Sequence, residues 1–124
     1  MANPRSSKAK GRRLQNLVRD ELRQAFPFLH DDDIKSQIMG VNGEDIVLSP
    51  AARKLIPYSI ECKNVEKLNF WACVRQTEAN IKEECAPALV IKKNGTKPYV
   101  AVPLNEWIEL VQIRTRNTDR KETD

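Results

Sequence analysis

Two acidic residues and one lysine lie at a spacing that suits phosphate chemistry. Glu61 and Lys63 are two residues apart in the segment SIECKN, and Asp45 precedes them in the segment GEDIVLS. Residues two apart in a β-strand point to the same face, so this carboxylate and this ammonium would lie side by side. Mg²⁺ prefers oxygen ligands, and an ammonium can contact a phosphate oxygen. If the two segments are neighbouring strands, their polar face could hold a divalent cation and a phosphate group.

The same pair also has an ordinary interpretation. On a solvent-exposed face, an ion pair between Glu61 and Lys63 would stabilise the fold by at most about 1 kcal/mol. A central strand of an α/β sheet is usually covered on both faces, however. Burying the two charges there is costly unless something satisfies both. We therefore favour the interpretation that Glu61 and Lys63 belong to a site for a cation and a phosphate group.

Turn signals and hydrophobic periodicity indicate the elements that must position these residues. Alternation in YSIECK puts Tyr58, Ile60 and Cys62 on one face and Glu61 and Lys63 on the other. We expect strands over 45–49, 58–63, 87–93 and 98–104, the last two joined as a hairpin around Asn94-Gly95, and helices over 12–26, 68–84 and 106–113. The sequence therefore predicts an α/β fold with a mixed β-sheet flanked by helices, in the order α-β-β-α-β-β-α.

Polar residues mark the expected starts of several helices. Asn69 and Asn105 are the expected N-caps of the second and last helices. Asp31 or Asp32 should cap a short turn or helix, which is far more common than metal binding by such an acidic run. Residues 50–55 could form a helical turn or a loop.

One acidic residue of the first helix interrupts its apolar stripe. Glu21 lies four residues after Leu17, three after Val18 and four before Ala25. This spacing puts it in the middle of the stripe. An unpaired carboxylate there would be costly. Either Glu21 has a partner, such as a metal ion or a cation, or the helix turns it towards solvent.

The composition excludes several classes of site. The chain has 124 residues, which favours one domain. Its cysteines, Cys62, Cys73 and Cys85, are odd in number and form no CxxC pair, so we expect buried free thiols and neither a disulfide framework nor a zinc site. His30 is the only histidine, which excludes a multi-histidine site. Neither a membrane helix nor a signal peptide is visible, so we expect an intracellular protein without a membrane partner.

The positive charge is concentrated at the N-terminus. The net charge is +4, whereas residues 1–13 alone carry five basic residues and no acid, which leaves −1 for the rest. We expect a disordered basic arm over residues 1–11, a domain over residues 12–113 and a flexible charged tail over residues 114–124. The arm suits DNA phosphates, although charge alone fits a solubilising tail equally well. The basic residues of residues 1–13 are Arg5, Lys8, Lys10, Arg12 and Arg13, so the last two lie at the start of the domain.

The pattern Asp-x15-Glu-x-Lys, formed by GED and IECK, resembles the PD-(D/E)xK nuclease superfamily. The segment KGRRLQNLV resembles the opening of phage endonucleases and archaeal-type Holliday junction resolvases, and the resemblance covers residues 10 to 102. It implies a restriction-endonuclease-like fold and an Mg²⁺-dependent endodeoxyribonuclease, with Mn²⁺ as a substitute and no organic cofactor. It also implies DNA as partner, allows a homodimer, and favours a phage-encoded protein in the host cytoplasm.

The resemblance assigns roles to particular residues. Asp45 and Glu61 would be metal ligands together with the backbone carbonyl of Cys62. Lys63 would orient the attacking water or stabilise negative charge. An acid from the first helix often completes such sites, and Glu21 is the candidate because its place in the stripe independently requires a partner.

The sequence departs from the superfamily pattern at two positions. Glu44 stands where the pattern has proline, and Gln15 stands where the resolvases have a first-helix glutamate. Gln15 could still hold a phosphate or a water at the metal. Gln76 on the second helix is a further candidate, since members of the superfamily often have a polar residue there, although it fits a solvent-facing position equally well.

The roles of the two tryptophans stay open, and so do two functions other than a nuclease. Trp71 could stack on a base, although core or interface positions are more common, and Trp107 could belong to a dimer seam. The alternative to a nuclease is a non-catalytic DNA-binding module on the same fold. A small interaction protein with a merely solubilising arm is a third candidate.

Overall fold

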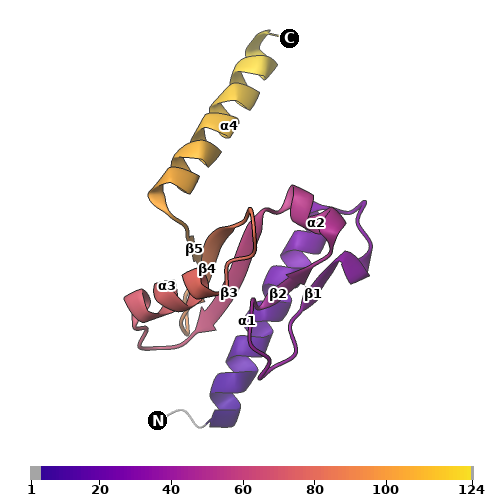
Figure 1. Ribbon diagram of the computed structural model, residues 1–124. Helices are drawn as coiled ribbons and strands as arrows, with labels where there is room; N and C mark the ends of the chain where they lie inside the picture. The colour runs from indigo at the N-terminus through magenta and orange to yellow at the C-terminus, as the bar shows by residue number, and fades with distance from the viewer. Residues whose placement is uncertain (1–3, 124) are drawn as a thin grey trace.

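The computed structural model describes residues 4–123 and has a mixed α/β fold (Figure 1). Within these residues it contains four α-helices and two small β-sheets. In chain order the elements are α1 (Pro4–Ala25), η1 (Asp31–Asp33), β1 (Ile34–Ser36), β2 (Ile46–Leu48), α2 (Pro50–Leu55), β3 (Tyr58–Asn64), α3 (Phe70–Ala79), β4 (Ala86–Lys92), β5 (Tyr99–Ala101) and α4 (Leu104–Thr123).

The larger sheet has the strand order β3-β4-β5. β3 and β4 are parallel, and α3 forms the crossover between them, as a parallel pair requires. β4 and β5 are antiparallel, and Gly95 between them has a φ of 78°, so the expected hairpin is confirmed. Asn69 accepts a hydrogen bond from the Ala72 N–H at 3.2 Å, which confirms it as the N-cap of α3. Ser49 caps α2 in the same way.

The smaller sheet contains one strand that the sequence analysis missed. β2 pairs antiparallel with β1, which follows the short helix η1 at Asp31–Asp33. β1 has only three residues, too few to show a period. The expected pairing of β2 with β3 is reduced to one backbone hydrogen bond, in which the Asp45 N–H donates to the Ile60 carbonyl at 2.8 Å. The two sheets therefore meet at Asp45.

The hydrophobic core lies on the face of β3 that carries Ile60 and Cys62, as the alternation predicted. These side chains pack with residues of α1, β2 and β4, including Leu14, Ile46 and Val90. The neighbouring residues Ser59 and Glu61 are also buried, so both faces of β3 are covered. β3 is an edge strand of the larger sheet, but because both of its faces are covered, a carboxylate on it is costly.

Both terminal segments differ from the expectation. The structure continues α1 back to Pro4 and α4 forward to Thr123, so residues 4–11 and 114–123 are helical where the sequence predicted an arm and a tail without regular structure. α4 also begins at Leu104, before the expected cap Asn105. Both segments lack the apolar periodicity that predicts the other helices. They are instead rich in Lys and Arg, which have high helix propensity, and Pro4 suits the first helical position. Residues 1–3 and 124 lie outside the described part.

Two smaller expectations can be compared with the structure. The three cysteines are free thiols, as predicted, but only Cys62 is buried while Cys73 and Cys85 are half-buried. Among residues 4–123, no helix is both long enough and apolar enough to cross a membrane.

Candidate active site

Asp45 lies where β2 and β3 separate. Its backbone bridges the two sheets, because its N–H donates to Ile60 and its carbonyl accepts from the Gln37 N–H at 2.8 Å. Two residues before Asp45, at Gly43, the chain turns away from β3, and the φ of Gly43 there is 116°. The Asp45 Oδ2 then accepts a hydrogen bond from the Cys62 N–H at 2.7 Å. The carboxylate replaces the missing strand partner, which holds it against the middle of β3.

Glu61 is the buried carboxyl group beside it. Its residue is 2% exposed, and the Asn80 Nδ2 donates to its Oε1 at 2.7 Å. Burial raises the pKa of Glu61 from its ordinary value of 4.5 to about 7. The bond from Asn80 and the charge of Lys63 act against this rise, whereas the negative charge of Asp45 and a hydrogen bond between the two carboxyl groups add to it. Asp45 and Glu61 are therefore close neighbours.

The backbone of Cys62 contributes to the same position. In a strand, the N–H and C=O of one residue point to the same edge. Because the Cys62 N–H points to Asp45, its carbonyl faces the gap beside β2. The Cys62 thiol belongs to the core instead, and burial raises its pKa above the ordinary value. The backbone, not the sulfur, is the part of Cys62 that can serve a site.

Lys63 lies two residues after Glu61 on β3 and is half-buried. Its ammonium is near enough to lower the pKa of Glu61, as an opposite charge does. The predicted alignment of carboxylate and ammonium on one face of this strand is therefore present in the structure.

Gln15 is buried on α1, the helix that packs against β1 and β3. Two contacts locate this part of α1: the Ser36 Oγ donates to the Asn16 Oδ1 at 2.8 Å, and the Asn64 Nδ2 donates to the Lys10 carbonyl at 3.5 Å. Ser36 is followed by Gln37, the residue that pairs with Asp45. Gln15 is 6% exposed, and its Oε1 has no hydrogen-bond partner among the described residues. A buried amide oxygen without a partner is costly, so it indicates a place for a ligand.

Glu21 does not occupy the inward position that its spacing suggested. The structure turns Glu21 to solvent, and Leu17 is 41% exposed. The line that packs inward runs instead through Gln15, Val18 and Leu22. Because the stripe of α1 is wide, a small roll of the helix exposes one edge of it. Of the two alternatives for Glu21, the structure has the one in which the helix turns it towards solvent, and Gln15 is the polar residue of α1 in the interior.

Gln76 is likewise exposed on α3. The polar residue that reaches Glu61 is Asn80, four positions later on the same side of the helix. Asn80 is the C-cap of α3, and the sequence analysis missed it. Its helical spacing from Gln76 was the available signal.

Glu44 points away from the site. It is buried and pairs with the Arg53 guanidinium of α2. Consecutive residues of an extended chain point to opposite sides, so Asp45 faces the junction while Glu44 faces α2. Its pairing explains how the chain accommodates an acid where the superfamily pattern has proline.

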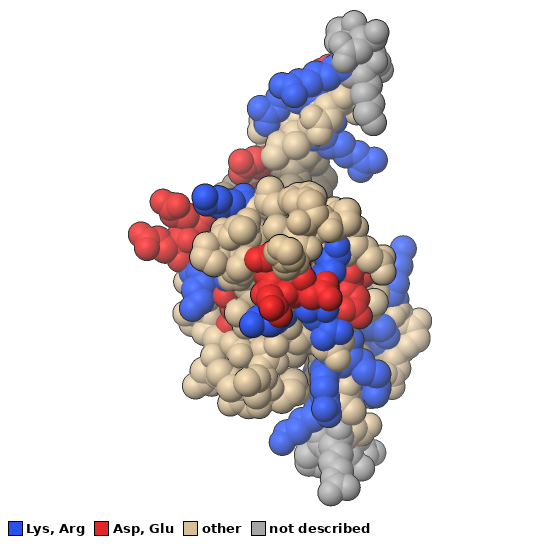
Figure 2. All heavy atoms as spheres, turned by 90° about the vertical axis from the view of Figure 1, so that its right-hand side faces the viewer, with Lys and Arg blue, Asp and Glu red and all other residues tan. Residues whose placement is uncertain are grey.

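The basic residues near the start of the chain form a surface on α1. Lys8, Arg12 and Arg13 are exposed, and Lys10 is half-buried, with its Nζ 3.7 Å from the Glu66 Oε1. Figure 2 shows Lys and Arg side chains gathered along the lower part of the molecule, towards its N-terminal end. The same helix thus carries exposed cations and the buried Gln15.

The oxygen donors at this junction are the carboxylates of Asp45 and Glu61 and the carbonyl of Cys62, and α1 carries the buried amide oxygen of Gln15. Among residues 4–123, no three His, Cys, Asp or Glu side chains lie together in a group that could hold a metal ion. The candidate set is therefore Asp45, Glu61, the Cys62 carbonyl and the Gln15 amide. Comparisons with protein-family models, with curated proteins and with solved structures each found no match for this chain.

Proposed function

We propose that this chain is an Mg²⁺-dependent endodeoxyribonuclease of the PD-(D/E)xK type, which hydrolyses DNA phosphodiester bonds. The observation that carries the proposal is the meeting of Asp45 and Glu61 at the strand junction, with Lys63 on the same strand as Glu61. Two neighbouring carboxylates in a buried position are unfavourable by themselves. A divalent cation between them would remove their repulsion.

The donor set fits a hard cation. Mg²⁺ binds oxygen atoms, and the residues that would hold it are Asp45, Glu61 and Cys62 through its carbonyl. The partnerless Oε1 of Gln15 supports the same assignment, because a cation or its hydration would satisfy that atom. A bound Mg²⁺ would supply charge neutralisation at the phosphoryl oxygens and a lower pKa for water. Mn²⁺ has similar ligand preferences and should substitute.

The chain's own residues have separable roles in this proposal. Lys63 would stabilise the negative charge that builds on the phosphate as the bond to water forms. Asn80 holds the Glu61 carboxylate in one orientation through its 2.7 Å hydrogen bond. The Cys62 N–H does the same for Asp45. Such fixed geometry favours catalysis because little reorganisation is needed at the moment of reaction.

The arrangement of the elements supports the finer assignment of a restriction-endonuclease-like core. α1 precedes both β2, which begins directly after Asp45, and β3, which carries Glu61, and α3 then leads into the parallel strand β4. The exposed cations of α1, Lys8, Arg12 and Arg13, would bind DNA phosphates without reading sequence. Holliday junctions and nicked duplexes are both substrates that such a site could cut, in a phage-encoded or a cellular protein.

Cleavage assays on supercoiled plasmid and on a synthetic four-way junction test the proposal. The wild type should cut at least one DNA in Mg²⁺ or Mn²⁺ and neither in EDTA. Asp45→Asn, Glu61→Gln and Lys63→Ala should each lose most activity. Two matched controls, Glu21→Gln and Lys67→Ala, change the same residue types at exposed positions and should cut normally.

Two outcomes would overturn the proposal. A wild type that is inert on both DNAs in both metals is not a nuclease of this type. If that inert protein still binds DNA equally well in EDTA, the chain is the non-catalytic DNA-binding module instead. Variants that cut as well as the wild type would show that the site is misassigned.

A further inference from the structure

α4 carries an apolar face that is open to solvent. Leu104, Trp107, Ile108 and Val111 are 74%, 54%, 43% and 40% exposed. Their spacing places all four on one side of the helix. Figure 1 shows α4 projecting from the body of the molecule. On the opposite side of its first turns the Tyr58 Oη donates to the Glu106 Oε2 at 3.1 Å. We call the four-residue surface the α4 face.

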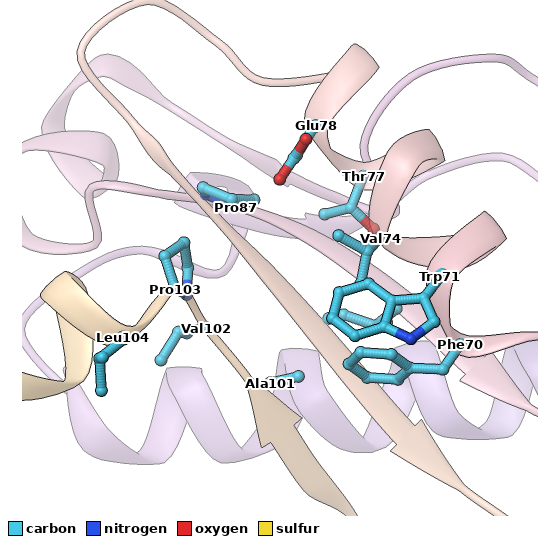
Figure 3. Close-up of a pocket in the computed structure, with 11 residues that line it drawn as sticks. Phe70, Trp71, Val74, Thr77, Glu78, Pro87, Ala101, Val102, Pro103 and Leu104 are labelled. Atoms are coloured by element: carbon cyan, nitrogen blue, oxygen red, sulfur yellow. The ribbon is translucent and has the colours of Figure 1, made fainter.

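An apolar cavity of about 280 Å³ adjoins the α4 face. It lies between α3 and the segment that leads from β5 into α4 (Figure 3). Its wall includes Phe70, Trp71, Val74 and Val102, and the Trp71 residue is 68% exposed. Leu104 lines the cavity and also begins the α4 face. The helix face and the cavity therefore form one continuous apolar surface.

We propose that this surface is the interface of a homodimer, in which the α4 helices of two copies pack antiparallel. The first argument is the spacing of the α4 face. Leu104, Trp107, Ile108 and Val111 are separated by three, one and three positions, so the pattern is the same in both directions. A two-fold axis between Trp107 and Ile108 would therefore place Leu104 opposite the partner's Val111 and Trp107 opposite the partner's Ile108. Each apolar residue meets an apolar residue, as an isologous contact requires.

Charge complementarity supports the same antiparallel packing. In the same register, Arg114 of each copy extends past Leu104 of the other, towards the segment between β5 and α4 that lines the cavity. Glu78 of α3 also lines that cavity. Figure 3 shows Glu78 at the α3 side of the cavity, across from Pro103 and Leu104. Antiparallel packing thus brings a guanidinium from one copy towards a carboxylate of the other, and the two-fold axis repeats the pair.

The area of the apolar surface also fits a dimer interface. Side chains of this size have roughly 200 Å² of surface each, so the four residues expose roughly 400 Å² per copy. Two copies would bury about 800 Å² from these residues alone. The cavity wall and Trp71 add to this, which brings the interface to the ~1,000 Å² or more expected of a specific contact. In a dimer with a two-fold axis, each copy also covers this surface of the other, so neither surface stays exposed.

Light scattering after size exclusion, on the full chain without DNA, tests the inference. The wild type should show about twice its 14.2 kDa mass at micromolar concentrations. Ile108→Asp should give the single-chain mass, while Asn117→Asp, a control with the same new charge on another side of α4, should keep the dimer. Circular dichroism should show that both variants retain the helical content of the wild type.

A charge exchange tests the proposed register. Glu78→Arg and Arg114→Glu should each weaken the dimer at least several-fold, and the double variant should recover most of the loss. Failure of the double variant to recover would overturn the antiparallel register. A wild type that stays at the single-chain mass up to about 100 µM would overturn the dimer and leave this surface to a different partner. Because no DNA or metal is present, these outcomes are independent of the nuclease assays.

Discussion

The sharpest prediction concerns the energetic cost of the buried Glu61 carboxylate. In the folded chain the pKa of Glu61 is raised from 4.5 to about 7. Between these values the folded state binds more protons than the unfolded state, so stability falls as pH rises through this window. The interval corresponds to roughly 3 kcal/mol of unfolding free energy. The loss should be complete above about pH 7 in a metal-free protein.

Glu61→Gln should remove this loss. The amide oxygen of Gln can still accept the bond from Asn80, and no charge has to be buried. In urea unfolding at pH 5 and pH 8 with EDTA, the variant should gain stability over the wild type by up to about 3 kcal/mol at pH 8 and by much less at pH 5. Glu21→Gln, at an exposed position, should follow the wild type at both pH values.

Mg²⁺ provides a second measurement on the same variants. A cation bound between Asp45 and Glu61 stabilises the folded state by mass action, so added Mg²⁺ should raise the wild-type stability at pH 8. The gain should be smaller in Glu61→Gln, which has lost one carboxylate. If the wild type and Glu61→Gln lose the same free energy between pH 5 and pH 8, the argument that Glu61 is a buried, desolvated carboxyl group is refuted.

Three further predictions concern the surroundings of the site. Asn80→Ala removes the hydrogen bond that lowers the pKa of Glu61, so the rising limb of kcat/KM against pH should move to higher pH; an unchanged pH profile would contradict the positioning role. Gln15→Glu should tighten Mg²⁺ binding several-fold in calorimetry, because a third carboxylate joins the donor set, whereas weaker or equal binding would place Gln15 outside it. Arg12→Ala with Arg13→Ala should weaken DNA binding uniformly across sequences and lower the salt slope of log K by about 2, and an unchanged slope would remove α1 from the DNA surface.

Alternation along the chain was sufficient to predict the faces of β3. Ile60 and Cys62 lie in the core, and Glu61 and Lys63 share the other face, because a strand has a period of two whatever packs against it. The hairpin at Asn94-Gly95 and the cap at Asn69 were also predictable from neighbouring residues alone. Each is a local preference that nearby residues determine.

The roll of α1 could not be predicted in this way. Leu17, Val18, Glu21 and Leu22 all lie within one broad stripe, and the sequence does not say which edge faces the sheet. Packing against β1 and β3 selects the edge with Val18 and Leu22, which buries Gln15 and exposes Glu21. A rotation of the helix about its own axis, by less than the angle between two consecutive residues, decides which polar side chain is in the interior.

The sequence by itself determined the chemical types at the site and their order on each strand: an acid in one strand, and an acid and a lysine two apart in the next. Only the tertiary structure decided that they meet. Asp45 reaches β3 because the chain turns away at Gly43 and leaves the Cys62 N–H to a side chain. Asn80 reaches Glu61 because α3 ends beside β3. These contacts join residues that are 17 and 19 positions apart, and long-range packing, not local preference, sets such distances.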